Sequence, residues 1–295
     1  MAQNSEITAK LDIAELADAW AEKKGRKPRL FTDIRFGAHT DLGRVRENNE
    51  DKFEFFEPEE LELLAVKGCV YAVADGMGGH SSGQIASELA LKTLLKAYYA
   101  DPSEDVAESA KAALLSANSF IYDTSQAIPD RNGMGTTCTA AIIRDDELYI
   151  AHVGDSRAYL IRDGEISKVS EDHSWVAEQV KRGAMTEEEA EMSPFRNVIT
   201  RSLGVTPEVE ADIYQEHLKK DDILVLCSDG LSGYVTSDDI LELTSAWSPS
   251  LAAMKLVDRA NDHGGGDNVT VLVVLVADIQ KSPVRLKRFF GLNWA

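Results

Sequence analysis

The sequence YAVADGMGGH at residues 71–80 sets the pattern on which the rest of the chain is organised. An apolar run that suits the core of a sheet stops at Asp75, and glycine fills three of the next four positions. A carboxylate at the end of a buried strand is unfavourable unless positive charge lies beside it. Because Asp-Gly is also a common turn dipeptide, this stretch taken alone favours an ordinary strand-to-loop turn. The alternative is a metal site in which Asp75 and the carbonyl of Gly76 face the same cation.

The composition is that of a large, acidic globular protein. The chain has 295 residues, 44% of them hydrophobic, which is enough for one large domain or two modest ones. Its 50 acidic and 31 basic residues give a net charge of −19, which argues against binding to nucleic-acid backbone or to anionic membranes. Cys69, Cys138 and Cys227 are odd in number and unclustered, so we expect buried, reduced thiols. The chain shows neither a membrane-spanning run nor a signal peptide, and we expect a cytoplasmic protein.

One central domain with an extension at each end is the simplest division of the chain. Residues 31–280 contain no internal repeat and no Pro/Gly linker. In residues 1–30, apolar side chains at helical spacing precede a basic stretch with Gly and Pro, which predicts a short amphipathic helix packed on its own domain. Residues 281–295 form a basic and aromatic tail. Such a tail can lie on a membrane interface, but we expect it to bind the protein's own acidic surface.

Short strands separated by turns dominate the central domain. Strands are predicted near residues 31–40, 52–56, 68–75, 135–143, 148–153, 158–161, 166–169, 208–214, 223–228 and 268–276. Helices are predicted near residues 81–100, 103–127, 173–192, 237–247 and 248–263. Residues 57–62 are expected to form an exposed acidic loop. The closely spaced turns Asp145-Asp146 and Asp163-Gly164 predict antiparallel pairing rather than an alternation of strands with crossover helices.

Further acidic positions share the local pattern of Asp75, each at an end of a predicted strand. They are Glu50-Asp51, Asp155, Asp229 and Asp267. Each one alone is typical of a turn. Together, with no clusters of Lys or Arg nearby, they predict a cage of oxygen ligands if the strand ends converge. Such a cage selects Mg²⁺ or Mn²⁺, whereas zinc sites usually include imidazole or thiolate.

Six motifs, taken in order, carry a resemblance to a known family. They are Arg46-x-x-Asn49-Glu50-Asp51, ADGMGGH (74–80), MGTT (134–137), VGDSR (153–157), SDGL (228–231) and GDNVT (266–270). The series resembles that of the metal-dependent type 2C (PPM) serine/threonine protein phosphatases, bacterial branch, and spans about residues 33–277. The resemblance implies an α+β fold, a four-layer α-β-β-α sandwich in which helices flank two packed antiparallel sheets.

The resemblance also implies a set of metal ligands. Asp75 would bridge two Mn²⁺ or Mg²⁺ ions, and the carbonyl of Gly76 would ligate one of them. Asp229 and Asp267 would complete the shell of one ion, while Glu50 would act at the other, partly through water. Two such ions, about 4 Å apart, activate a shared water as the attacking hydroxide and neutralise charge on the phosphoryl oxygens, so no protein nucleophile is needed.

Three further positions receive roles from the same resemblance. Asp51 would hold metal-bound waters, Asp155 would help to bind a third, weaker ion, and Arg46 would bind the substrate phosphate. The planar guanidinium of Arg46 suits phosphate oxygens, although its spacing alone is also typical of a surface salt bridge with Glu47 or Glu50.

Several positions depart from the family pattern or stand outside the predicted chemistry. Met77 lies where many eukaryotic relatives carry a histidine general acid; it cannot donate a proton, so a metal-bound water is the expected donor. His80 is expected to be structural or to lie behind the ligands, and His152 and His173 to be satisfied strand-end histidines. Residues 182–204 resemble the family's mobile flap. Ser193-Pro194 and Gly233 replace a common His-Pro and a common Asp, and these changes concern substrate contacts.

The sequence therefore predicts a phosphatase that removes phosphate from phosphoserine and phosphothreonine in proteins. Its expected partners are phosphorylated proteins, including the bacterial Ser/Thr kinases that it would oppose, and we expect a monomer. One alternative is a non-catalytic, phospho-dependent signalling module, which the loss of a ligand would favour; Asp75, Asp229 and Asp267 are all present. Another is a phosphatase dedicated to one partner-switching regulator.

Overall fold

The computed structural model describes residues 26–79 and 81–281. The helix predicted in residues 1–30, almost all of the tail at 281–295, and His80 lie outside these ranges. Within them, none of the helices is long and apolar enough to cross a membrane.

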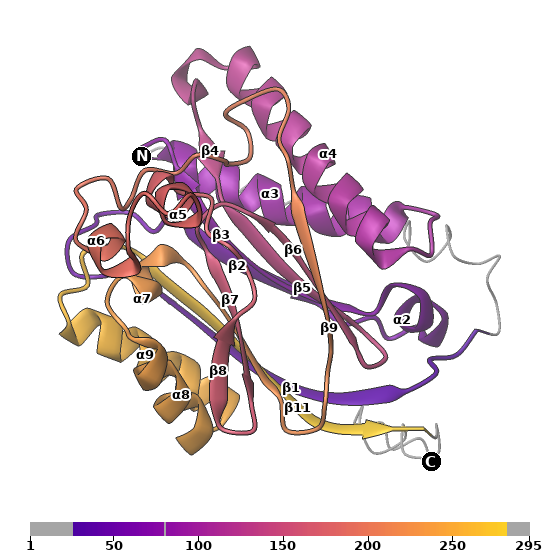
Figure 1. Cartoon of the computed structure of the whole chain (residues 1–295). Helices are drawn as coiled ribbons and strands as arrows, with labels where there is room; N and C mark the ends of the chain where they lie inside the picture. Colours follow the sequence, from indigo (N-terminus) through magenta and orange to yellow (C-terminus); the bar gives the residue numbers. More distant parts are fainter. Residues whose placement is uncertain (1–25, 80, 282–295) are drawn as a thin grey trace, which may run out of the picture.

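The strands form two antiparallel sheets that pack face to face (Figure 1). The five-stranded sheet has the order β1 (Phe31–Asp41), β11 (Val269–Gln280), β10 (Ile223–Cys227), β7 (Arg157–Arg162) and β8 (Glu165–Lys168). The second sheet has the order β2 (Asp51–Phe56), β3 (Cys69–Met77), β5 (Cys138–Arg144), β6 (Glu147–Val153) and β9 (Asp212–His217), with β4 (Gly135–Thr136) paired to β3. The pairings are antiparallel, as the short turns predict.

Alternation of side chains along β3 explains the layering. Tyr71 and Val73 point into the core between the two sheets, where they join Leu226 and Val274 of the other sheet. The intervening residues of β3, such as Ala72, point to the opposite face and pack under helices. Both faces of the strand are therefore apolar, which is why its sequence is a continuous hydrophobic run rather than an alternating one.

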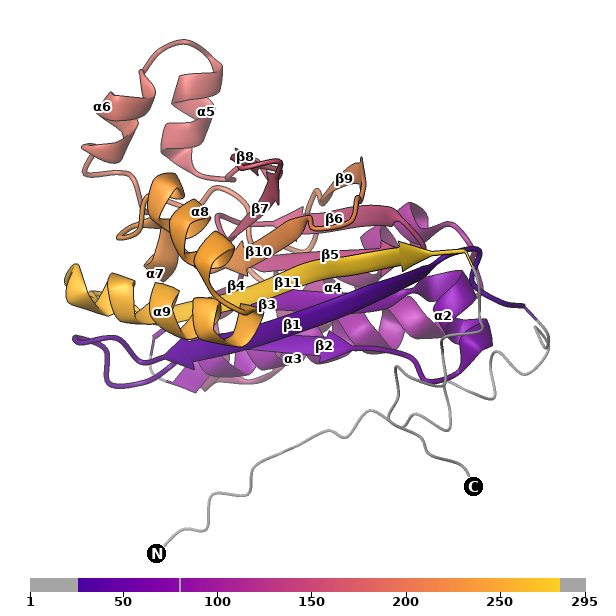
Figure 2. The same ribbon diagram turned by 90° about the horizontal axis from the view of Figure 1, so that it is seen from below.

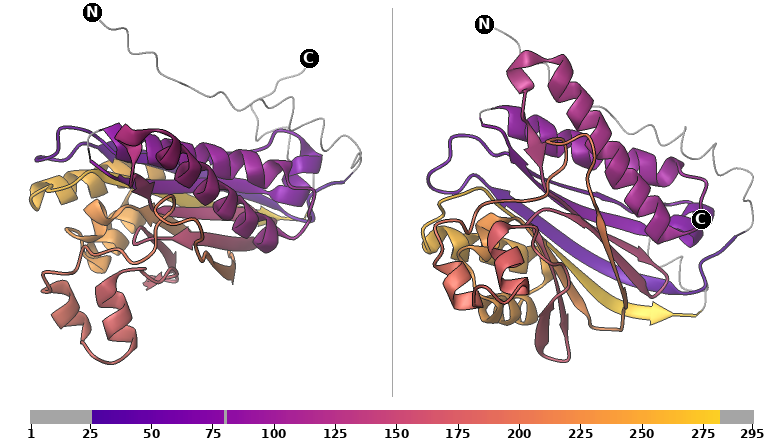
Figure 3. Two further views of the ribbon diagram at one scale, coloured as in Figure 1. Left: turned by 90° about the horizontal axis from the view of Figure 1, so that it is seen from above. Right: turned by 45° about the horizontal axis from the view of Figure 1, so that its top comes forward.

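Helices cover the outer face of each sheet. On the six-stranded side lie α2 (Leu61–Lys67), α3 (Ser81–Ala100), α4 (Val106–Ala127) and the 3₁₀ turn η2 (Pro129–Arg131). On the five-stranded side lie α7 (Asp229–Ser232), α8 (Ser237–Ala246) and α9 (Pro249–Asp262). Helices α5 (Trp175–Lys181) and α6 (Glu187–Glu191) stand away from both sheets (Figures 2 and 3). The predicted four-layer α-β-β-α sandwich is confirmed.

The structure corrects several predicted boundaries. Strand β3 does not stop at Asp75 but runs on to Met77, because Gly76 and Met77 pair with β4. The acidic loop expected at 57–62 ends at Leu61, where α2 begins; this helix has no side-chain cap and is held by packing of Leu63 and Val66, which leaves little local signal. The strand predicted at 208–214 lies at 212–217 instead. All three cysteines are buried and free, as expected.

Candidate metal centre

The ends of strands from both sheets bring the predicted carboxylates to one end of the sandwich. In the six-stranded sheet, Asp51 at the start of β2 lies directly opposite Asp75 in β3. In the five-stranded sheet, Cys227 is the last residue of β10. It pairs with Arg157, the first residue of β7, and with Val271, which lies near the start of β11. The loops that carry Asp155 and Asp267, and helix α7, which begins at Asp229, therefore lie at the same end of the sheet.

The charges of these carboxylates act on one another. Desolvation raises the pKa of Asp75 well above its ordinary value, and the charges of Asp51, Asp229 and Asp155 raise it further. Asp267 in turn adds to the raised pKa of Asp229, after burial. Sequence positions as far apart as 51 and 229 thus share one site.

Two threonines hold the backbone of Asp75. Thr137 accepts a hydrogen bond from the Asp75 N–H through Oγ1 at 2.9 Å, and its own N–H donates to the Asp75 carbonyl at 2.9 Å. Thr136 Oγ1 donates to the same carbonyl at 2.8 Å. These three hydrogen bonds satisfy the N–H and the carbonyl of Asp75 and fix its backbone beside β4. The MGTT motif at 134–137 contains both threonines, but its sequence alone did not reveal this supporting role.

Asp51 is buried, and only one of its two carboxylate oxygens has a hydrogen-bond partner among the described residues. Ser228 Oγ donates to Asp51 Oδ2 at 2.6 Å and accepts from the Thr270 N–H at 3.0 Å. Burial, together with the charges of Asp229 and Asp267, raises the pKa of Asp51 to about 7. Ser228, which lies immediately before Asp229, is a further support that sequence reasoning missed.

Three buried carboxylate oxygens have no hydrogen-bond partner among the described residues: Oδ1 of Asp51, of Asp155 and of Asp229. Burial is the main cause of the raised pKa of Asp155, about 8, and of the raised pKa of Asp229, with neighbouring carboxylates adding to both. Anions crowded in this way are stabilised either by protons or by cations. Because the donors are oxygens, the cations that fit are Mg²⁺ and Mn²⁺.

The side chains alone do not enclose an ion. Across residues 26–79 and 81–281, no three acidic, histidine or cysteine side chains are gathered closely enough to hold a metal. A bound ion would therefore take part of its shell from water and from backbone oxygens. Mg²⁺ in particular keeps several waters when protein carboxylates bind it. The donor set fits hydrated ions better than a closed cage.

Gly76 lies in a gap that admits no side chain. A Cβ at this position would overlap the backbone of Gly83 in α3 and would lie 2.7 Å from the carbonyl oxygen of Glu50. Likewise, a Cβ at Gly83 would overlap the Glu50 carboxylate and would lie 2.8 Å from the carbonyl carbon of Gly76. The two glycines let the start of α3 press against β3 and place Glu50 beside the Gly76 carbonyl.

Glu50 is also tied to the loop that carries Asp267. Its N–H donates to Asn268 Oδ1 at 2.8 Å, and its carbonyl accepts from Ser87 Oγ at 2.6 Å. Asn268 Nδ2 donates to the carbonyls of Leu42 and Asn48 at 3.0 and 2.9 Å. Asn268 therefore joins the Glu50 and Asp267 loops, a role that the GDNVT motif did not reveal from sequence.

Arg46 lies at the rim of the cluster. Its Nη2 donates to Asp267 Oδ2 at 2.7 Å, and its side chain is 54% exposed. The hydrogen bond to Asp267 is the main cause of its raised pKa, and the charges of Glu50 and Asp75 add to it. This partner lies 221 residues further along the chain, whereas the spacing pointed to Glu47 or Glu50.

The chain matches known proteins over most of the residues that build this site, from Arg46 to Asp229. A family model described as protein phosphatase 2C matches residues 44–264, more than half of the chain. The chain belongs to the protein phosphatase 2C family. This membership confirms the predicted family and the predicted class of enzyme, a protein serine/threonine phosphatase.

Bacterial members of the protein phosphatase 2C family are similar to this chain over most of its length. The serine/threonine phosphatase stp of Listeria monocytogenes serotype 4b is 38% identical over 240 residues, which cover 80% of this chain and 93% of that protein. The crystal structure of the Mycobacterium tuberculosis phosphatase PstP/Ppp matches with a TM-score of 0.74 and 38% identity, over 82% of this chain and 98% of that one.

A further protein phosphatase 2C structure bears on the metal. It is the catalytic domain of the phosphatase PstP in complex with two manganese ions. It matches with a TM-score of 0.71 and 36% identity, over 84% of this chain and 98% of that one. A relative with the same fold thus binds two Mn²⁺ ions.

Proposed function

We propose that this protein phosphatase 2C hydrolyses phosphoserine and phosphothreonine in proteins at the carboxylate cluster, with divalent cations as cofactors. The observation that carries the proposal is the convergence of acids from both sheets with unpartnered, buried oxygens on Asp51, Asp155 and Asp229. Two Mn²⁺ or Mg²⁺ ions would supply activation of water and neutralisation of charge on the phosphoryl group.

The ligands would come from four strand ends. Asp75 lies centrally among the acids and would contact both ions, with the Gly76 carbonyl beside it. Asp229 and Asp267 would complete one shell, and Glu50, next to Gly76, would act at the other. Asp155 would help to bind a third, weaker ion, and its buried, unpartnered Oδ1 supports this role.

Other residues would orient water and substrate. With Oδ2 of Asp51 engaged by Ser228, its Oδ1 is left to accept from a water in the site. Arg46 is half exposed at the rim, where its guanidinium would bind the substrate phosphate. Met77 has no proton to give, so the leaving serine or threonine oxygen would take its proton from water. The proposed substrates include a Ser/Thr kinase, and the proposed setting is a monomer in the cytoplasm.

Metal removal tests this proposal directly. With Mn²⁺ the protein is expected to release phosphate from a phosphothreonine peptide; EDTA should reduce release to background, and excess Mn²⁺ should restore it. Mn²⁺ should also raise the melting temperature, because an ion at 100 times its Kd stabilises the fold by about 2.7 kcal/mol. Differential scanning fluorimetry and a phosphate assay measure the two effects on one sample.

The non-catalytic alternative gives a different result in the same assay. A phospho-binding module would show thermal stabilisation by Mn²⁺ without phosphate release. Absence of release from phosphoserine and phosphothreonine peptides and from a generic phosphate ester, at saturating Mn²⁺, would rule out the proposed activity.

Replacing Arg46 tests its contact with phosphate. Arg46→Ala is expected to lower kcat/KM by about 10- to 100-fold, since a hydrogen bond to a charged group contributes about 1.5–3 kcal/mol. The Mn²⁺ concentration needed for half-maximal activity should not rise, because the substitution also frees Asp267 from its ion pair. Steady-state kinetics across a Mn²⁺ series checks both statements. Arg35→Ala is the control, because Arg35 is an exposed arginine on β1. An equal loss of kcat/KM in Arg35→Ala would show that Arg46 has no specific role in binding phosphate.

A further inference from the structure

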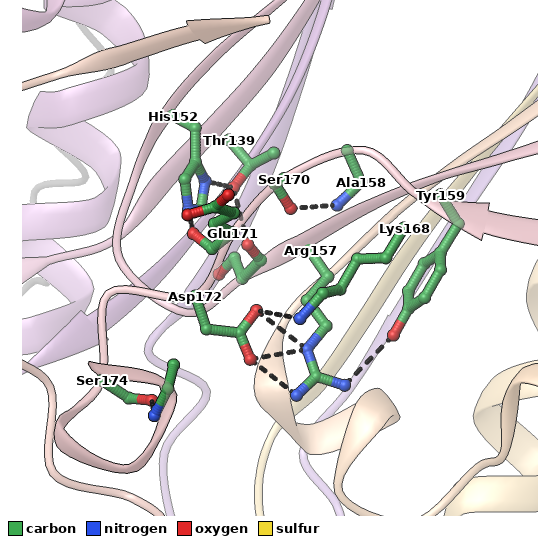
Figure 4. Close-up of polar contacts among 12 residues, drawn as sticks. Thr139, His152, Arg157, Ala158, Tyr159, Lys168, Ser170, Glu171, Asp172 and Ser174 are labelled. Carbon is green, nitrogen blue, oxygen red and sulfur yellow. Dashed lines mark hydrogen bonds and ion pairs between the residues drawn. The ribbon is translucent and has the colours of Figure 1, made fainter. Parts of the chain in front are cut away.

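Residues 171–174 lie between β8 and α5 and join the Asp155 loop to the protruding helices. Each residue is fixed by a different partner: the carbonyl of Glu171 accepts from His152 Nε2 at 2.9 Å, and Asp172 pairs with Arg157 at 2.7 Å. Ser174 caps α5 by accepting from the Ala177 N–H. Figure 4 shows the Asp172 carboxylate facing the side chains of both Lys168 and Arg157. Hydrogen bonds and ion pairs thus hold this segment to the two sheets and to α5.

His173 is the residue of this segment that contacts the Asp155 loop. The Gly154 N–H donates to His173 Nδ1 at 3.0 Å, and the His173 N–H donates to the Gly154 carbonyl at 2.7 Å. Because Nδ1 accepts, the ring proton is on Nε2, which donates to Asp212 Oδ2 at 2.9 Å. The ring is buried and lies 4.7 Å from that of His152. Both histidines are satisfied, as the sequence predicted.

Gly154 also packs against Thr137, which lies closer to the centre of the site. It has a φ of 117°, which favours glycine, and a Cβ there would lie 3.0 Å from Thr137 Cα and overlap the Thr137 side chain. Thr137 is the residue whose hydroxyl and N–H hold the backbone of Asp75. Gly154 is therefore pressed between His173 on one side and the support of Asp75 on the other.

The other side of His173 begins the protruding unit. Its carbonyl accepts from the Thr200 N–H at 2.8 Å, and the Trp175 N–H donates to the Val198 carbonyl at 2.8 Å. Ser174 and Ile199 form an isolated bridge between these two contacts. The segment that contains α5 and α6 therefore begins and ends at one short pair of strands, residues 173–175 and 198–200. His173 belongs to this pair and also contacts the Asp155 loop.

We infer that His173 is a positioning residue that couples the base of the α5–α6 unit to the Asp155 loop, so that a shift of one displaces the other. This inference rests on the proposed assignment of Asp155 to the metal site. A side chain that orients a metal-binding loop affects metal affinity or activity by about 10- to 100-fold when it is removed.

Two substitutions test the two hydrogen bonds of the His173 ring one at a time. In His173→Asn, Oδ1 replaces Nδ1 and keeps an acceptor for the Gly154 N–H, while the link to Asp212 is lost. In His173→Gln, Nε2 keeps a donor for Asp212, while the Gly154 N–H loses its acceptor. His173→Gln is expected to weaken Mn²⁺ binding by about 10-fold or more. His173→Asn is expected to remain within about threefold of the wild type, since only a peripheral hydrogen bond is lost.

Mn²⁺ binding measured by electron paramagnetic resonance, with phosphopeptide kinetics in parallel, tests the inference on the full-length protein. His217→Gln is the control for replacing a histidine by glutamine, because His217 is exposed on β9. Equal behaviour of the two His173 variants, whether both normal or both impaired, would overturn the coupling. Should His173→Gln fail to fold, His173→Ala takes its place: it also removes the acceptor for the Gly154 N–H, so it must bind Mn²⁺ more weakly than His173→Asn, and an affinity equal to that of His173→Asn would overturn the coupling.

Asp155→Asn separates this inference from the proposed site. If Asp155→Asn binds Mn²⁺ with wild-type stoichiometry and affinity, the assignment of Asp155 is wrong and the coupling to it falls as well. If Asp155→Asn is impaired while His173→Gln is normal, the site stands and only the coupling is wrong.

Discussion

Asp75→Asn is expected to lower kcat/KM by about 10³-fold or more while making the protein more stable in EDTA. Asp75 would contact both cations, whose stabilisation of charge supplies several kcal/mol to the transition state. In the folded protein, desolvation and the neighbouring carboxylates hold the pKa of Asp75 well above its ordinary value, so the ionised form opposes folding at neutral pH. Asn carries no charge and removes this repulsion.

The gain in stability has a definite sign and pH window. The folded pKa is higher than the unfolded one, so the penalty is present at neutral pH. It shrinks as the pH falls toward about 4, because the unfolded chain then also binds a proton at this position. At pH 7.5 in EDTA, we expect the melting temperature to rise by a few degrees, since about 1 kcal/mol shifts it by about 2–4 °C in a domain of this size.

Asp258→Asn is the matched control for Asp75→Asn. Asp258 is an exposed carboxylate on α9 and should change neither activity nor melting temperature. A melting temperature that falls for Asp75→Asn would show that the lost activity comes from a damaged fold. Retained activity at saturating Mn²⁺ would exclude Asp75 as the bridging ligand.

Gly76→Ala is expected to destabilise the protein by about 3 kcal/mol or more, which corresponds to a melting temperature lower by about 6–12 °C. The added methyl group would meet backbone atoms of Gly83 and Glu50, which are held by α3 and by the hydrogen bond of Glu50 to Asn268. Backbone has no alternative rotamer by which to move away. Thermal unfolding in EDTA measures this effect without a contribution from bound ions.

Gly233→Ala provides the comparison for Gly76→Ala. Gly233 has a φ of −78°, in the helical region, and its nearest contact for an added Cβ is the Asp229 carbonyl oxygen at 3.1 Å. We expect a change of less than about 1 kcal/mol there. If both substitutions have the same small effect, the close packing of β3 against the start of α3 does not limit stability.

Most of the fold could be predicted because its signals are local. Apolar runs bounded by Asp-Gly and Asp-Asp turns predict short antiparallel strands, and the order of six motifs carried the resemblance that implied the four layers. The errors came where local signal was weak or misleading. Asp75-Gly76-Met77 looks like a turn, yet it continues β3, because β4 supplies a pairing partner from about 60 residues away. Helix α2 is too short and too poorly capped to be detected.

By itself, the sequence determined which residue types stand at the strand ends: carboxylates followed or preceded by glycines, a pattern that already favoured hard cations. Only the tertiary structure decided how those acids are held and paired. Ser228 binds Asp51 across 177 positions, and Arg46 binds Asp267 rather than the adjacent Glu47. It also placed His173 between the Asp155 loop and the α5–α6 unit. The physical reason is that periodicity and turn residues report on neighbouring positions, whereas these partners are chosen by which strand ends meet when the two sheets pack.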